Sequence, residues 1–170
     1  MKIKKYINYV SLAALLIPVL SACNKIPERE GTTVEKMAGE WYVRIDDKPK
    51  RYIMTTYNTS TNSADEFWVQ TSNLRDLDVG PNENINIKGK VPVQLSAQTF
   101  AGTGLTNILA ATATAIPKFE VANGKVITNG TVGVASRSPA DSIYFELKVK
   151  GKTFKISGFH RTGFQADEPQ

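Results

Sequence analysis

Apolar and polar residues alternate with a period of two through most of the chain after Gly39, which is the pattern of half-buried β-strands. In the first run, Trp41, Val43 and Ile45 share one face, while the residues between them occupy the other. Residues 51–57 and 66–71 are further β-rich runs, and the alternation recurs in residues 84–88, 91–97 and 143–149. Pro92 cannot donate a hydrogen bond to a neighbouring strand, so it predicts a strand edge or a bulge in its run.

Two hairpins are predicted from residues that favour turns. Asn123-Gly124 lies in the middle of a β-rich stretch over residues 119–128, and Asn-Gly in that setting is the strongest short-range hairpin signal. Near the C-terminus, Gly151 interrupts the alternation of residues 143–158 and predicts a second hairpin.

The chain is predicted to be all-β, because no long helical period interrupts the short runs. Residues 102–115 carry a weaker pattern that fits a short helix or a strand, and we favour the strand. Many short strands separated by turn residues indicate an antiparallel sandwich or barrel. Closing the sheet into a barrel removes exposed strand edges, which invite aggregation. Pattern alone leaves both architectures open.

Residues 1–22 have the features of a targeting segment and are not expected to belong to the folded domain. Three lysines precede an apolar run over residues 10–20, which is too short for a membrane span of about 20 residues. The run leads into Leu-Ser-Ala-Cys at residues 20–23. This is the lipobox of bacterial lipoproteins, in which the cysteine thiol receives a diacylglycerol and becomes the N-terminus after cleavage. We therefore expect a lipoprotein signal peptide over residues 1–22 and lipidation of Cys23.

Cys23 is the only cysteine, so the folded part has to be stable without a disulfide. The alternative for Cys23 is a buried free thiol. Two or more acyl chains, palmitate among them, give stable anchoring. We expect a cell-envelope protein anchored in the outer membrane, and Asn24 after the cysteine is compatible with that sorting. Polar residues 23–35 are predicted to form the lipidated tether, and residues 36–170 the β-barrel domain.

The formal net charge of +5 gives no case for nucleic-acid binding. Three of the excess basic residues, Lys2, Lys4 and Lys5, lie in the targeting segment. The remaining chain is close to neutral and has no basic stripe, so nucleic acid is not an expected partner.

Gly39-Glu40-Trp41 resembles the opening of the first strand in lipocalins and other calycin barrels, which carry Gly-x-Trp after a short helical turn. The resemblance implies a single antiparallel calycin-like β-barrel of about eight strands, with a short N-terminal helical turn. It also implies that Trp41 closes one barrel end and that Arg161, from the last strand, covers the indole. A guanidinium over an indole face gains a cation–π contact and shields apolar surface.

A second resemblance covers nearly the whole chain after the signal. The lipobox, Gly-Glu-Trp-Tyr-Val at residues 39–43, Asp-Ser-Ile-Tyr-Phe-Glu at 141–146 and the ending at 155–164 together resemble a family of Bacteroides-type lipoproteins. That family is described as lipid-binding proteins and hydrolases with a calycin-like barrel. The resemblance implies the fold and an envelope location.

The residues themselves give little support to hydrolase activity, which is implied by the resemblance alone. The sequence contains no Gly-x-Ser-x-Gly elbow. His160 is the only histidine, so a Ser-His-Asp triad would have to combine it with Ser142 or Ser157 and with Asp141. One histidine and no carboxylates at ligand spacing also disfavour a metal site. We expect no catalytic residues, no metal and no cofactor.

The binding hypothesis rests on the predicted barrel interior. Small barrels of about eight strands either fill with side chains or hold one small ligand. The candidate ligand-binding residues share apolar character and inward parity, and they are Trp41, Val43, Ile45, Phe67, Val69, Phe145 and Leu147. The same residues would equally pack a solid core, so the pattern leaves a hollow and a filled barrel open.

We predict binding of an apolar or lipid-like ligand without catalysis. The alternative is an accessory or adhesion lipoprotein that presents Tyr52, Tyr57 and Trp68 to a protein or glycan partner, because aromatic residues are enriched in binding sites. A lipid hydrolase ranks third.

Overall fold

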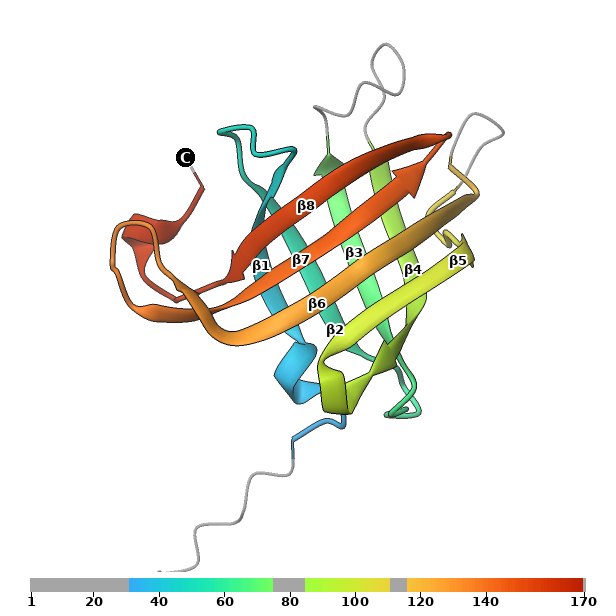
Figure 1. Cartoon of the computed structure of the whole chain (residues 1–170), viewed down its shortest axis with the longest axis horizontal. Coiled ribbons are helices and arrows are strands. Elements are labelled where there is room, and N and C mark those ends of the chain that lie inside the picture. The colour runs from blue at the N-terminus through green and yellow to red at the C-terminus, as the bar shows by residue number, and fades with distance from the viewer. Residues whose placement is uncertain (1–30, 75–84, 111–115, 170) are drawn as a thin grey trace, which may run out of the picture. The chain divides into compact units, whose positions relative to one another are not determined.

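Eight antiparallel strands close into a barrel in the computed structural model, which describes residues 31–74, 85–110 and 116–169 (Figure 1). Every strand pairs with the next in the chain, and β8 pairs with β1. The strands are β1 (Gly39–Ile45), β2 (Tyr52–Asn58), β3 (Glu66–Leu74), β4 (Ile85–Gln94), β5 (Thr99–Thr106), β6 (Lys118–Val132), β7 (Pro139–Val149) and β8 (Lys152–His160). The predicted all-β calycin-like barrel is confirmed.

A single turn of 3-10 helix, η1 (Glu35–Met37), precedes β1, as predicted. Val34 and Met37 are fully buried in the core. The Thr33 backbone N–H donates to Asn62 Oδ1 at 2.9 Å, and the Thr33 hydroxyl donates to the Asn62 carbonyl oxygen at 3.0 Å. Packing against the barrel therefore begins at Thr33, within the stretch assigned to the tether from the sequence.

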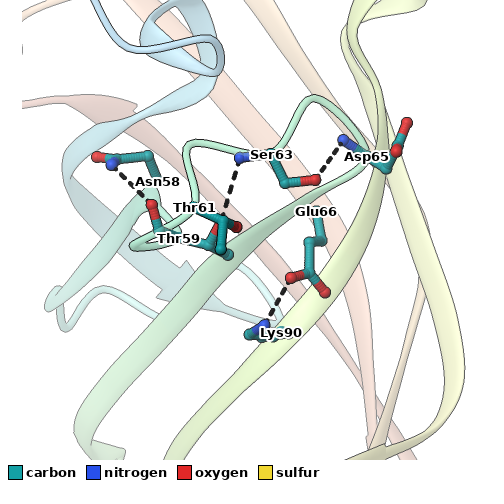
Figure 2. A network of polar contacts seen from close by, with 7 residues as sticks. All are labelled: Asn58, Thr59, Thr61, Ser63, Asp65, Glu66 and Lys90. Carbon is teal, nitrogen blue, oxygen red and sulfur yellow. Dashed lines mark hydrogen bonds and ion pairs between the residues drawn. The ribbon is translucent and has the colours of Figure 1, made fainter.

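The turn between β2 and β3, which contains Asn62, is organised by side-chain oxygens (Figure 2). Thr59 Oγ1 accepts a hydrogen bond from the Ser63 backbone N–H at 3.2 Å, and Ser63 Oγ accepts one from the Asp65 N–H at 3.1 Å. Serine and threonine hydroxyls stabilise turns in this way because they replace missing backbone partners. This turn and η1 form one end of the barrel.

The prediction of a hairpin at Asn123-Gly124 is wrong, because β6 runs straight through both residues. Asn123 has a left-handed φ of 54°, and the register against β7 shifts between Ala122 and Lys125. Gly124 lies so close to β5 that a Cβ would come within 2.3 Å of the Phe100 carbonyl oxygen. Asn-Gly satisfies the left-handed requirement of a β-bulge as well as that of a tight turn. Pairing with β5 and β7 on both sides favours the bulge.

The other strand predictions hold with changed boundaries. The second hairpin is confirmed, with Lys150 and Gly151 at positive φ between β7 and β8. Two predicted runs merge into β4, which is followed by the 3-10 turn η2 (Leu95–Ala97). On the β5 side, pairing of β4 begins only at Val93, so Pro92 is not required to donate to β5. For residues 102–115, where a strand was favoured, β5 confirms a strand up to Thr106. Residues 111–115 lie outside the described chain.

Two apolar clusters form on opposite sides of the barrel wall. The larger fills the interior with inward-pointing side chains from all eight strands. The smaller contains Tyr42, Ala140 and Phe159 and lies on the outer face. β6 and β7 extend beyond the barrel wall as an overhang that reaches the C-terminal 3-10 helix η3 (Gln165–Asp167) (Figure 1). This overhang covers the smaller cluster.

Candidate functional site

The side chains predicted to line a ligand site all belong to the interior apolar cluster. They are Trp41, Val43, Ile45, Phe67, Val69, Phe145 and Leu147, and each is at most 2% exposed. The rings of Phe67 and Phe145 both pack on Phe100, with centroid distances of 5.2 and 5.7 Å. Side chains this deeply buried contact protein atoms on all sides. A ligand among these residues would have to push them apart.

Trp41 is held at the barrel end next to η1 by a short chain of hydrogen bonds. The indole N–H donates to Thr56 Oγ1 at 2.8 Å, and the Thr56 hydroxyl donates to the Met37 carbonyl oxygen at 2.6 Å. The ring of His160 lies against the indole at 5.1 Å with an interplanar angle of 90°. Trp41 is therefore held by contacts from β2, η1 and β8.

Arg161 follows β8 directly and is held by two carboxylates. Its guanidinium donates to Glu40 Oε2 at 2.7 Å and to Glu168 Oε1. The hydrogen bonds to Glu40 and Glu168 raise the pKa of Arg161 above its ordinary range. The ring that lies against the Trp41 indole belongs to His160, the residue before Arg161.

The barrel wall separates His160 from the two candidate nucleophiles. His160 pairs with Trp41 and points inward, and its Nδ1 lies 3.1 Å from the Arg161 carbonyl oxygen. Ser142 and Ser157 have the opposite parity and line a groove on the outer face. Because adjacent parities face opposite sides of a sheet, this arrangement does not bring a serine hydroxyl to the imidazole.

Within residues 31–74, 85–110 and 116–169, no group of three His, Cys, Asp or Glu side chains could hold a metal ion. None of the helices in that part of the chain has the length and apolar character needed to cross a bilayer. Cys23, the predicted lipidation site, lies outside the described residues.

A groove of about 430 Å³ lies on the outer face over β1, β8 and β7. Two cross-strand rows form its floor. Tyr42, Phe159 and Ser142 make one row, and Arg44, Ser157 and Tyr144 make the other. The rings of Tyr42 and Phe159 meet edge-on at 5.7 Å. The groove therefore combines an aromatic floor with hydroxyl groups and positive charge.

Arg44 and Arg51 supply the positive charge of this groove. The guanidinium carbon of Arg51 lies 5.9 Å from the centroid of the Phe159 ring. Burial, and then the charge of Arg44, lower the pKa of Arg51. No acidic residue is found among the described side chains that line the groove.

Asp167 in η3 fastens the overhang to the C-terminal segment. Its carboxylate is 2% exposed and accepts hydrogen bonds from the backbone N–H groups of Ala135 and Ser136 at 2.7 and 3.0 Å. The hydroxyls of Ser136 and Thr162 each donate to it at 2.6 Å. These hydrogen bonds, that of the Ser136 hydroxyl first, lower the pKa of Asp167 well below its ordinary range. The ionised carboxylate thus holds the loop that forms one wall of the groove.

A second outer surface carries the stacked pair Tyr57 and Trp68, whose ring centroids lie 6.5 Å apart. Lys88 Nζ lies 5.6 Å from the Tyr57 ring and 5.5 Å from the Trp68 ring. We call these residues, with Lys90, the aromatic patch. Tyr52, expected to be exposed in the same patch, is 7% exposed and belongs to the interior cluster. Its parity places it opposite Val43, so it faces the core.

The groove was not predicted from the sequence. The available signal was the placing of Tyr42 and Phe159 on the outward parity of β1 and β8. Large aromatic residues on both faces of a strand indicate that each face is covered. β6 and β7 provide that cover, and the full length of β6 was not predicted, because a hairpin was expected at Asn123-Gly124.

A family model described as "Lipid-binding putative hydrolase" matches residues 26–165. A search of curated proteins gives no significant match. The matched range runs from before η1 to the first residue of η3, so it includes the whole barrel. The description of the family and the closed barrel both fit a lipid-binding role.

Proposed function

The chain belongs to the "Lipid-binding putative hydrolase" family, and on that basis we propose that it is an envelope lipoprotein whose β-barrel domain binds an apolar or lipid-like ligand without catalysis. The single observation that carries the proposal is the family match over the entire closed barrel. Eight-stranded barrels are a common scaffold for holding one small apolar ligand.

The ligand would meet apolar surface on both sides of the barrel wall. The predicted lining residues make the interior apolar, although entry there requires packed side chains such as Phe67 and Phe145 to move. On the outer face, the groove is lined by Tyr42 and Phe159, which are 2% and 7% exposed, together with Val134, which is 49% exposed.

Anchoring through acylated Cys23 is the second part of the proposal. It is supported by the lipobox at residues 20–23 and by the polar sequence that follows it.

Binding without catalysis is supported by the position of the one histidine. The imidazole of His160 faces Trp41, whereas Ser142 and Ser157 face the outer groove. A serine nucleophile needs a base within hydrogen-bond reach, about 2.6–3.2 Å. This pair of serines has no such contact with the imidazole in the described structure.

An accessory role is the second candidate and is favoured by the aromatic patch. Tyr57 and Trp68 stack on the outer face beside Lys88 and Lys90, and the Tyr57 hydroxyl donates to Gln70 Oε1 at 2.8 Å. Stacked rings next to hydrogen-bonding groups suit a protein or glycan partner. Loss of glycan-array or pull-down binding in Trp68→Ala, with lipid binding intact, would support this role.

The proposed function is tested by analysing what the protein carries. Residues 24–170 are purified from cells, extracted with organic solvent and examined by mass spectrometry against an unrelated exported protein handled identically. Recovery of one lipid class at a near one-to-one ratio is the expected result. An empty extract, together with no binding of fluorescent fatty-acid probes, would overturn the proposal and favour the accessory role.

A further inference from the structure

Arg44 and Arg51 stand side by side on the outer face of the barrel. The β1–β2 register ends with Val43 opposite Tyr52. Arg44 follows Val43 in the chain, and Arg51 precedes Tyr52. Like charges in facing positions on neighbouring strands destabilise a sheet. In the part of the chain that the structure describes, no carboxylate forms an ion pair with either guanidinium. The pair is therefore an uncompensated positive site.

The carboxylate that acts on Arg51, that of Asp167, is bound to other groups. Asp167 acts on Arg51 through its charge, but four hydrogen bonds hold its carboxylate against the overhang. It does not belong to the lining of the groove. An anion that enters the groove would thus find two guanidinium groups free to bind it bidentately.

The rest of the groove suits an apolar or flat body. Tyr42 and Phe159 form the floor, and Val134 on the overhang is 49% exposed at the wall. Ser142 and Ser157 add hydroxyl groups. A volume of about 430 Å³ falls within the range of roughly 300–1,000 Å³ found for small-molecule sites.

We infer that this outer groove is a binding site for an oxyanion, a carboxylate or phosphate, that is joined to an apolar chain. Arg44 and Arg51 hold the oxyanion, while the Tyr42–Phe159 floor contacts the chain. The inference rests on the proposed lipid-binding function and gives it a ligand class and a location. It places the polar end of the ligand outside the barrel, where both arginines already lie.

The chain of the ligand has a path beyond the groove. Tyr144 lies in the same cross-strand row as Arg44 and Ser157. It also lines a second outer hollow of about 650 Å³, with Val93, Phe100 and Lys125 among the other lining residues. A chain that leaves the arginines along this row passes over Tyr144 into the second hollow.

Calorimetric titration of the full chain with octanoate and octyl phosphate tests the inference, with octyltrimethylammonium as the cationic control probe. The double variant Arg44→Gln/Arg51→Gln is expected to weaken binding of both anions by roughly tenfold or more, because charge-assisted hydrogen bonds are lost. The matched control, Lys36→Gln/Lys118→Gln, removes the same charge from exposed positions outside both hollows. It is expected to bind like the wild type.

A second variant keeps both arginines and fills the floor. Ser157→Trp places a large ring between Arg44 and Tyr144. It is expected to weaken the binding of both octanoate and octyl phosphate, and a thermal melt is expected to show that the barrel is still folded. Equal binding by wild type, Arg44→Gln/Arg51→Gln and Ser157→Trp would overturn the inference and leave lipid binding in place. If the wild type binds no lipid probe and carries no extracted lipid, the proposed function itself fails.

The source of the oxyanion is decided by a further arm of the same experiment. Binding of the full chain to nanodiscs of phosphatidylcholine is compared with binding to nanodiscs that also contain phosphatidylglycerol. A gain with phosphatidylglycerol that is lost in Arg44→Gln/Arg51→Gln supports a membrane headgroup in the groove. Arginine-dependent binding of octanoate without that gain supports a free amphiphile, and arginine-independent binding in both formats contradicts the inference.

Discussion

Trp41 joins three elements that are distant in the sequence. Its N–H bonds to Thr56 on β2, Thr56 bonds on to Met37 in η1, and its ring meets His160 on β8. A buried donor that keeps a partner costs little, whereas one left unpaired costs about 1–3 kcal/mol. Trp41 is therefore both part of the apolar core and the end of a chain of hydrogen bonds.

Replacing Trp41 by alanine is expected to lower the free energy of unfolding by ~3–5 kcal/mol, the range for truncating a large aromatic side chain in a core. The residue is fully buried, so the change leaves a cavity at the barrel end. Urea denaturation followed by circular dichroism measures the effect. An unfolding curve that coincides with that of the wild type would show that Trp41 is not a plug.

Thr56→Val tests the polar part of the same contact. Valine keeps the shape of threonine but removes the hydroxyl, so the indole N–H and the Met37 carbonyl lose their partner. We expect a loss of about 1–3 kcal/mol in unfolding free energy. Thr55→Val is the matched control, because Thr55 is only half-buried on the opposite face of β2. Equal stability of the two variants would contradict the role given to Thr56.

At the scale of elements, the overhang of β6 and β7 is the feature that distinguishes the outer face. It is stabilised by the apolar contact of Ala140 with Tyr42 and Phe159 and by the hydrogen bonds of Asp167. A two-stranded ribbon is marginal by itself in water. The C-terminal segment therefore supplies the contacts that keep the wall of the groove in place.

Asp167 makes stability depend on pH. Its pKa in the folded protein lies below the value of about 3.9 for an aspartate in a flexible chain. Its contribution is thus fully present above that unfolded value and is lost as the pH falls from there towards the folded pKa. We expect Asp167→Asn to be less stable near neutral pH and to lose less stability on acidification below about pH 4. Melting temperatures measured across pH check this. An equal fall in melting temperature on acidification for the wild type and for Asp167→Asn would contradict it.

At the scale of the whole molecule, the first and last strands meet to close the barrel. β1 and β8 pair over Trp41 to Ile45, and Gly158 lies so close to β1 that a Cβ would approach the Tyr42 carbonyl oxygen to 2.3 Å. Both ends of the domain are therefore tied to one seam.

The proposed anchor predicts that Cys23→Ser abolishes membrane retention. The serine hydroxyl cannot take the thioether-linked diacylglycerol, so the chain would lose the acyl groups that hold it to a bilayer. Cell fractionation with immunodetection is the measurement, and a conservative change in the tether, Lys25→Arg, serves as control. A serine variant that still sediments with membranes would contradict the anchor.

Much of the fold was predictable because alternation reports which face of a strand is buried. Trp41, Val43 and Ile45 pack inside as expected, and so do Phe145 and Leu147. The site was less predictable, since the same period says nothing about a second cover on the outer face. Tyr42 and Phe159 lie far apart in the sequence, and only strand pairing brings them together.

The sequence by itself determined the all-β class, the inward set of apolar residues and the Gly-x-Trp opening, because these depend on local period and composition. The tertiary structure decided the rest. It turned Asn123-Gly124 into a bulge, since β6 pairs with β5 on one side and with β7 on the other across these residues. It also placed Arg44 beside Arg51 and His160 against Trp41, because register and closure act between residues that no local pattern connects.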